Sequence, residues 1–107
     1  MDIKRNFIAN DWVEGASTVR NINPSDTNDV VGLYASADAA TTNDAIEAAA
    51  AAAPAWARST PEQRADALDQ IGTALLARRE ELGALLSREE GKILAEGIGE
   101  VVRAGRV

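Results

Sequence analysis

The sequence contains no cysteine and no histidine among its 107 residues. A chain without these residues has no disulfide framework, no thiol nucleophile, no imidazole base and no zinc cluster of the usual ligands. Aromatic residues make up only 4% of the chain, and much of its 46% hydrophobic share is alanine. Because an alanine side chain buries little area, the few large apolar residues decide how much of a core this chain can form.

Positive charge is also scarce, since 11 Lys and Arg residues stand against 17 Asp and Glu residues, for a formal net charge of −6. The two signs are interspersed, so we expect neither nucleic acid nor a membrane as a partner. The main apolar stretch, AIEAAAAAAPAWA, contains a glutamate and a proline and is shorter than a bilayer span. The start MDIKRN lacks the apolar segment of a secretory signal, which favours a cytoplasmic location.

The first third of the chain predicts short strands. Residues 7–9 and 12–14 flank Asn10 and Asp11, which tolerate positive φ and suit a two-residue hairpin turn. Residues 18–22 are predicted as the next extended run. Asn23 and Pro24 close it, because the residue before a proline is pushed away from the α region.

The chain is predicted to leave these strands through a turn and one further strand. The stretch NPSDTND is rich in turn residues, and VVGLYA at 30–35 predicts a fourth strand. Everything after Ser36 predicts helix. Asp38 is an N-cap candidate, with Thr41 and Asp44 as the competing pair. Pro54 predicts an end or a kink in the first helix.

A capping box predicts where the second helix begins. Thr60 is its cap, Pro61 its first helical residue and Gln63 the residue that completes the box. Helix continues over 79–91, where Gly91 is a natural C-cap. The last run, 93–107, has no stop signal, which predicts a helix cut in its middle. Its apolar side is formed by Leu94, Ile98, Val101 and Val102.

These pieces, in this order and spacing, resemble the amino-terminal segment of the aldehyde dehydrogenase superfamily. FIANDWVEG is similar to the family's opening hairpin, an aromatic residue, Ile-Asn-Gly and Trp-Val. INPSDTNDVVGLYASAD is similar to its Asn-Pro-Ala-Thr-Gly-Glu-Val-Ile segment and following strand, with Asn28 in place of the usual Gly. The stretch from PAWARSTPEQ to SREEGK is similar to its Trp-containing helix junction, long helix and Glu-Thr-Gly-Lys signature. The resemblance covers nearly the whole chain from Phe7 on.

The resemblance implies a fold and an activity. Residues 1–107 would be the amino-terminal part of an NAD(P)-binding aldehyde dehydrogenase domain, truncated and without a second domain. The parent would be an α/β protein, and this chain a mostly α segment with an N-terminal β-hairpin and short strands, an α+β fragment. The parent would oxidise an aldehyde to a carboxylate with NAD or NADP. The stretch EEGK with EGIGEVVRAGRV is most similar to the branch that oxidises α-ketoglutarate semialdehyde.

The resemblance also implies partners for this segment. They are the rest of the same polypeptide, an aldehyde substrate and, in the full-length enzyme, one or three further copies in a homodimer or homotetramer. Trp12 and Trp56 are expected to pack against the cofactor domain and to lie at an open face without it.

The resemblance assigns no catalytic and no cofactor-binding residue here, because the family's cysteine, glutamate base and nucleotide-binding units lie further along. We therefore expect this segment alone to be inactive and not to bind NAD. Some relatives bind a monovalent cation through the two carbonyls before Asn-Pro and a carboxylate of the Glu-Thr-Gly-Lys signature. The corresponding residues here are Asn21, Ile22 and Glu89, and a solvated or capping Glu89 is the alternative.

Other motifs favour structural interpretations. Glu89 and Glu90 are helix neighbours that point in different directions, unlike the facing carboxyls of a glycosidase. The REE triplets beginning at Arg79 and Arg88 predict solvated helix surface, and the glycines form no dinucleotide fingerprint. The alternative to a dehydrogenase segment is an autonomous small helical interaction module without enzymatic activity.

Overall fold

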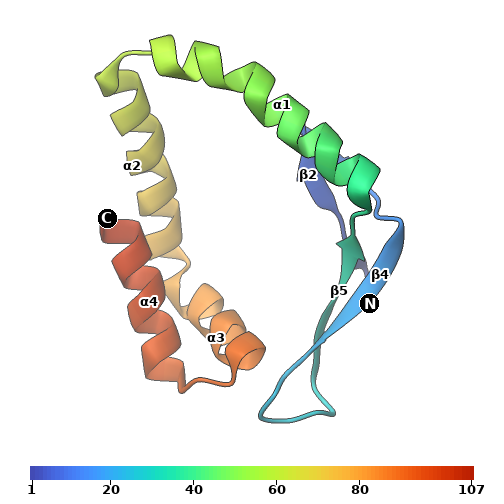
Figure 1. Ribbon diagram of the computed structural model, residues 1–107. Coiled ribbons are helices and arrows are strands. Elements are labelled where there is room, and N and C mark those ends of the chain that lie inside the picture. The colour runs from blue at the N-terminus through green and yellow to red at the C-terminus, as the bar shows by residue number, and fades with distance from the viewer. The chain divides into compact units, whose positions relative to one another are not determined.

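The computed structural model describes every residue from 1 to 107 (Figure 1). The chain divides into two compact units, and each takes residues from two separate stretches. The first unit consists of Met1–Asn21 with Gly32–Ser59, and the second of Ile22–Val31 with Thr60–Val107. Five short strands precede four helices, so the predicted fold class, a mostly α chain with short strands, is confirmed. None of the four helices combines the length and the apolar character needed to cross a membrane.

Two small sheets form from the first 36 residues. The three-stranded sheet has the order β1-β5-β4, with bounds Ile3–Lys4 for β1, Val30–Ser36 for β5 and Ser17–Ile22 for β4. Strand β1 runs parallel to β5, with Ile3 opposite Leu33. Strands β4 and β5 confirm the extended runs expected from the sequence. Strand β1 was not predicted, because two residues are too few to show an alternating pattern.

The predicted hairpin is present, but its turn lies one residue earlier than expected. Strand β2 (Asn6–Ile8) pairs antiparallel with β3 (Asp11–Val13), and Ile8 stands opposite Asp11. The loop is therefore Ala9 and Asn10, whose φ angles are 51° and 67°. The predicted Asn10-Asp11 turn was wrong because the register of β2 with β3 places the loop one residue earlier, and Ala9 adopts the positive φ of a type I′ loop despite its Cβ.

Helix α1 (Ala39–Arg58) follows β5 in the first unit. It begins as predicted at Asp38, whose carboxylate accepts a hydrogen bond from the Thr41 backbone N–H at 2.8 Å. That bond lowers the pKa of Asp38. Pro54 does not end the helix, which continues to Arg58. The surface of α1 is open at this turn, so water can satisfy the carbonyl that loses its partner at Pro54.

Helix α2 (Pro61–Ala77) opens the helical part of the second unit with the predicted capping box. The Thr60 hydroxyl accepts from the Gln63 backbone N–H at 3.1 Å, and the Gln63 side chain accepts from the Thr60 backbone N–H at 3.0 Å. Arg78 separates α2 from α3 (Arg79–Glu90). Gly91 ends α3 in the left-handed conformation with φ 74°, which confirms the predicted C-cap.

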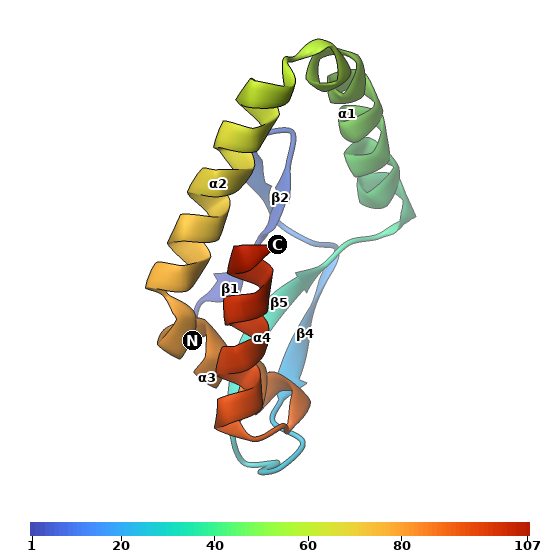
Figure 2. The same cartoon turned by 90° about the vertical axis from the view of Figure 1, so that its left-hand side faces the viewer.

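Helix α4 (Leu94–Arg106) lies beside α2 and α3 (Figures 1 and 2). Glycines allow α4 to lie close to α2 and α3, because they have no Cβ. A Cβ added to Gly72 would lie 2.7 Å from the Gly105 carbonyl oxygen, and one added to Gly83 would lie 2.5 Å from Ile98 Cγ1. Among the hydrophobic side chains only Val101, on the predicted apolar side of α4, is buried. The core of the second unit therefore lies along α4.

Candidate functional site

The residues that could carry catalysis are few. Cysteine and histidine are absent from the chain, and the structure gathers no group of three or more acidic side chains that could hold a metal ion. A candidate site must therefore be built from hydroxyl groups, carboxylates, cationic side chains and backbone groups.

The three predicted cation ligands come from both units. Asn21 is half-buried in β4 and belongs to the first unit, whereas Ile22, the last residue of that strand, is exposed and belongs to the second. Glu89 is exposed in the last turn of α3, also in the second unit. Two carbonyls and one carboxylate are hard oxygen donors of the kind that such a cation prefers. A cation site at these three residues stays a prediction.

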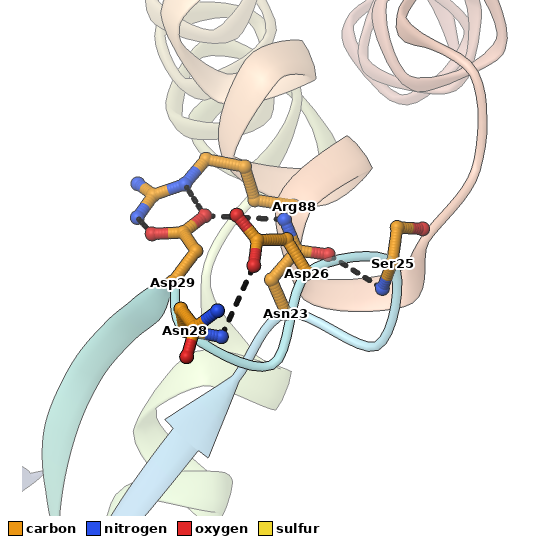
Figure 3. A network of polar contacts seen from close by, with 6 residues as sticks. All are labelled: Asn23, Ser25, Asp26, Asn28, Asp29 and Arg88. Carbon is orange, nitrogen blue, oxygen red and sulfur yellow. Dashed lines mark hydrogen bonds and ion pairs between the residues drawn. The ribbon is translucent and has the colours of Figure 1, made fainter.

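The most connected polar cluster of the second unit links the loop after β4 to α3 (Figure 3). The Arg88 guanidinium donates to both oxygens of Asp29, from Nε at 2.8 Å and from Nη2 at 2.6 Å. The Asn23 side chain donates to the same carboxylate at 3.1 Å. The Arg88 bonds, followed by the Asn23 bond, hold the pKa of Asp29 at about 2, below its usual value of 3.8. Asp29 is therefore an anion at any ordinary pH.

The loop in this cluster is also bonded within itself. The side-chain oxygen of Asn23 accepts from the Ser25 backbone N–H at 2.9 Å, and that of Asp26 accepts from the Asn28 backbone N–H at 3.1 Å. The Asn23 backbone N–H donates to the Asp29 carbonyl at 3.0 Å and closes the loop. Short polar side chains that bond to backbone two residues on are typical of tight turns, which the NPSDTND composition had predicted.

Sequence reasoning missed the ion pair itself. Arg88 was predicted to lie on a solvated helix surface, but it pairs with an acid 59 residues away. Patterns within a helix show only partners three or four residues apart, so no signal in one sequence points to Asp29. By contrast Arg78 pairs with Glu81 three residues on, as the helix spacing predicts.

A second polar cluster lies between α3 and α4. The Lys92 ammonium forms ion pairs with Glu90, at 2.7 Å, and with Glu100. Its hydrogen bonds to Glu100 and then to Glu90 raise the pKa of Lys92 above the usual value. The Ser87 hydroxyl donates to the Lys92 carbonyl at 2.5 Å. A lysine held protonated between two carboxylates is suited to fixing the α3–α4 connection and unsuited to acting as a base or nucleophile.

The hollows of the first unit hold no catalytic constellation. One, of about 530 Å³, is lined by Met1, Asp2, Ile3, Arg5, Glu14, Gly15 and Thr18. Its Arg5 and Glu14 form an exposed ion pair at 3.7 Å. Another, of about 320 Å³ and mostly apolar, lies between the β2–β3 hairpin and α1. The apolar hollow has no ionisable side chain in its lining, and in the first hollow the Glu14 carboxylate is paired with Arg5.

Large apolar side chains are exposed on every helix and on four of the five strands. Trp12 is 65% exposed and Trp56 51%, which confirms that both lie open in this chain. Phe7 contacts Trp12 with a ring-centroid distance of 4.9 Å, yet its side chain is also mostly exposed. Exposed apolar surface of this kind is typical of interaction sites, ligand-binding grooves or aggregation-prone faces.

The chain is similar to known proteins along almost its whole length. The aldehyde dehydrogenase family model matches residues 12–107. Aldehyde dehydrogenase family 7 member A1 of Pisum sativum is 40% identical over 95 residues, which are 89% of this chain and 18% of that protein. An alpha-ketoglutaric semialdehyde dehydrogenase of Bacillus subtilis (strain 168) is 37% identical over 100 residues, which are 92% of this chain and 20% of that protein.

The fold is also similar to a segment of a solved structure. An NAD-dependent aldehyde dehydrogenase from Sinorhizobium meliloti superposes with a TM-score of 0.91 at 28% identity, covering 98% of this chain and 22% of that one. The chain thus spans about a fifth of the length of the relatives it matches.

Proposed function

This chain belongs to the aldehyde dehydrogenase family, and from that premise we propose that residues 1–107 are the amino-terminal segment of an NAD(P)-dependent aldehyde dehydrogenase. The segment contributes a folded layer and no catalytic group. The rest of the polypeptide binds the nicotinamide cofactor, supplies the nucleophile and joins further copies into a dimer or tetramer.

One observation of the structure supports this division of labour. The helices have well-formed ends, with a capping box on α2 and a left-handed glycine after α3, yet Val101 alone among the hydrophobic side chains is buried. Local structure is thus specified without the burial that usually stabilises it. We take the open apolar side chains to be the surface on which the rest of the enzyme packs.

The proposed substrate is an aldehyde that carries a carboxylate, with α-ketoglutarate semialdehyde as the specific candidate. Support comes from the resemblance of EEGK and EGIGEVVRAGRV to that branch and from the Bacillus subtilis relative, whose name gives this substrate. The cofactor is NAD or NADP. Residues 1–107 alone are expected to bind neither, because the chain lacks a dinucleotide fingerprint.

A chimera tests the proposal. Residues 1–107 replace the matching segment of the Bacillus subtilis enzyme, and formation of the reduced cofactor is followed with α-ketoglutarate semialdehyde. We expect turnover by the chimera and none by residues 1–107 alone. A matched chimera with Gly83→Leu, which places a large side chain against Ile98, is expected to lose activity together with folded protein.

Two results would count against the proposal. One is a soluble, folded chimera without turnover, which would show that this segment does not replace its counterpart. The other is a 107-residue chain that unfolds sharply on its own and saturably binds a partner unrelated to dehydrogenases, which would favour the interaction module. Micromolar NAD binding by residues 1–107 in calorimetry would contradict the assignment of the cofactor to the rest of the enzyme.

A further inference from the structure

The segment of residues 22–31 is unusual because it belongs to the helical unit while the strand residues on both sides of it belong to the other. The chain enters the second unit at Ile22 and leaves it after Val31. Residues within this segment must therefore make the contacts that join it to the helices (Figure 3).

Two of its contacts lie at the end of α3. The first is the two-pronged ion pair between Asp29 and Arg88. The second is the packing of Pro24 and Ser25 on Gly91, where an added Cβ would lie 2.9 Å from Pro24 Cγ and 3.0 Å from Ser25 Oγ. Neither of these two contacts brings in a buried apolar side chain; one uses charge and the other the missing Cβ of Gly91.

The segment keeps its own shape independently of those contacts. Its backbone bonds join Asn23 to Asp29 at 3.0 Å, Asp26 to Asn23 at 3.2 Å and Asp29 to Asp26 at 2.9 Å. All three donors and acceptors lie inside the loop. Undocking would therefore break the ion pair and the glycine contact while leaving these bonds in place.

Solvent reaches the ion pair. The side chain of Arg88 is 43% exposed and that of Asp29 is 29% exposed. Exposed ion pairs contribute little to stability and are weakened further by salt, because mobile ions screen them.

We propose that residues 22–31 form an ion-pair strap, a preformed loop that docks reversibly on the carboxyl end of α3 through Asp29 and Arg88 and is released by salt. Gly91 acts as the seat of the strap, because any side chain there occupies the place of Pro24 and Ser25. This device concerns the conformation of the chain and stands apart from the proposed enzymatic activity.

The absence of native cysteine provides a direct test, because two introduced thiols would be the only ones. Thr27→Cys in the strap and Ala95→Cys in α4, both at exposed positions, accept spin labels. Pulsed electron resonance then measures the distribution of distances between the labels. We expect one narrow distance at about 0.05 M salt and a second, broader population at about 1 M.

Matched variants separate the strap from general effects of charge. R88Q removes the ion pair with Asp29. We expect the undocked fraction to rise by up to about five-fold at low salt, which is the effect of losing one exposed ion pair. R78Q removes an equally two-pronged pair that is local to the helix, with bonds of 3.0 and 2.7 Å to Glu81, and should leave the distances unchanged. The swapped pair of Asp29→Arg with Arg88→Asp should restore docking.

Gly91→Ala provides a second line of evidence that leaves the charges in place. It should undock the strap at low salt, whereas Gly99→Ala, at a position with nothing within 4 Å, should not. Equal distributions for R88Q and R78Q, or a broad distribution at low salt in the labelled chain without any further substitution, would overturn the proposal. These distances are measured on the 107-residue chain, so they do not depend on whether the chimera turns over.

Discussion

Single residues set the conformation of this chain at several points, and Ala9 is the least expected of them. It occupies the left-handed region with φ 51°, which glycine and asparagine usually fill. The pairing of β2 with β3 places Ala9 and Asn10 in the loop, and their positive φ angles are those of a type I′ turn, which matches the twist of the strands. The residue preferences of turns predicted Asn10 and Asp11 as the loop, because these preferences do not include the register of the strands.

Ala9→Gly should stabilise the first unit by roughly 0.5 to 1 kcal/mol. The left-handed conformation costs an L-residue about 1 to 2 kcal/mol, and the greater freedom of glycine in the unfolded chain offsets part of that gain. Chemical denaturation followed by circular dichroism measures the difference. Ala45→Gly, inside α1, is the control and should destabilise by about 0.5 to 1 kcal/mol. A loss of stability in Ala9→Gly would contradict the strain at this turn.

Asp29 should make the second unit sensitive to acid. Its pKa is about 2 in the folded chain, below the usual 3.8, first because of Arg88 and then because of Asn23. A depressed folded pKa gives stability that is fully present above the unfolded value and is lost as the pH falls through the folded one. We therefore expect the midpoint of denaturation to fall between about pH 4 and pH 2 more steeply in the unsubstituted chain than in D29N.

R88Q provides the control for this pH dependence, because it removes the group that lowers the pKa most. Its acid transition should resemble that of D29N. If D29N and the unsubstituted chain lose stability in parallel over this pH range, the ion pair makes no pH-dependent contribution.

At the scale of elements, helix ends were predictable and helix contacts were not. The caps at Asp38, Thr60 and Gly91 were all placed correctly, because each depends on residues within one turn. The effect of Pro54 was harder to predict, since whether a proline ends a helix depends on what surrounds the backbone carbonyl that loses its hydrogen-bond donor. The close crossings of α4 depend on glycines in separate helices, which no local pattern relates to one another.

Two glycines of α4 give opposite predictions for the same substitution. A Cβ on Gly97 would overlap the Gly83 carbonyl oxygen, whereas a Cβ on Gly99 would meet nothing within 4 Å. Gly99→Ala should stabilise by up to about 1 kcal/mol through helix propensity. Gly97→Ala should destabilise by about 1 to 3 kcal/mol, because α4 must move away from α3. Thermal denaturation of the two variants measures both changes in stability. Equal changes would show that α4 is not tightly packed on α3 at Gly97.

At the scale of the whole molecule, the family and the fold class followed from the order of motifs, while the strap and β1 did not. Four stretches at family spacing were enough for the resemblance, and the family match confirms it. The cation site at Asn21, Ile22 and Glu89 stays a prediction. Two of its three ligands would be backbone carbonyls, which any residue supplies, so their side chains carry no signal for it.

The open apolar surface predicts how the chain responds to a quencher. Trp12 and Trp56 are each more than half exposed, so acrylamide should quench the fluorescence of both in the 107-residue chain. W12F and W56F leave one tryptophan each and assign the signal. In the chimera, a fluorinated tryptophan at either position can be told apart from the other tryptophans of the enzyme. It should be shielded from acrylamide, because apolar surface of this kind packs against further protein. Unchanged access in a folded, active chimera would argue that the tryptophans face solvent in the enzyme.

The ion pair across 59 residues also leads us to expect an order of events during folding. Closing so long a loop costs more entropy than forming the contacts between neighbouring helices. The helices α3 and α4 are joined by three residues, so they can pair early. On the ribosome the strap emerges well before the helix that receives it. We therefore expect the docking of this loop on Arg88 to be among the last steps in the maturation of this unit.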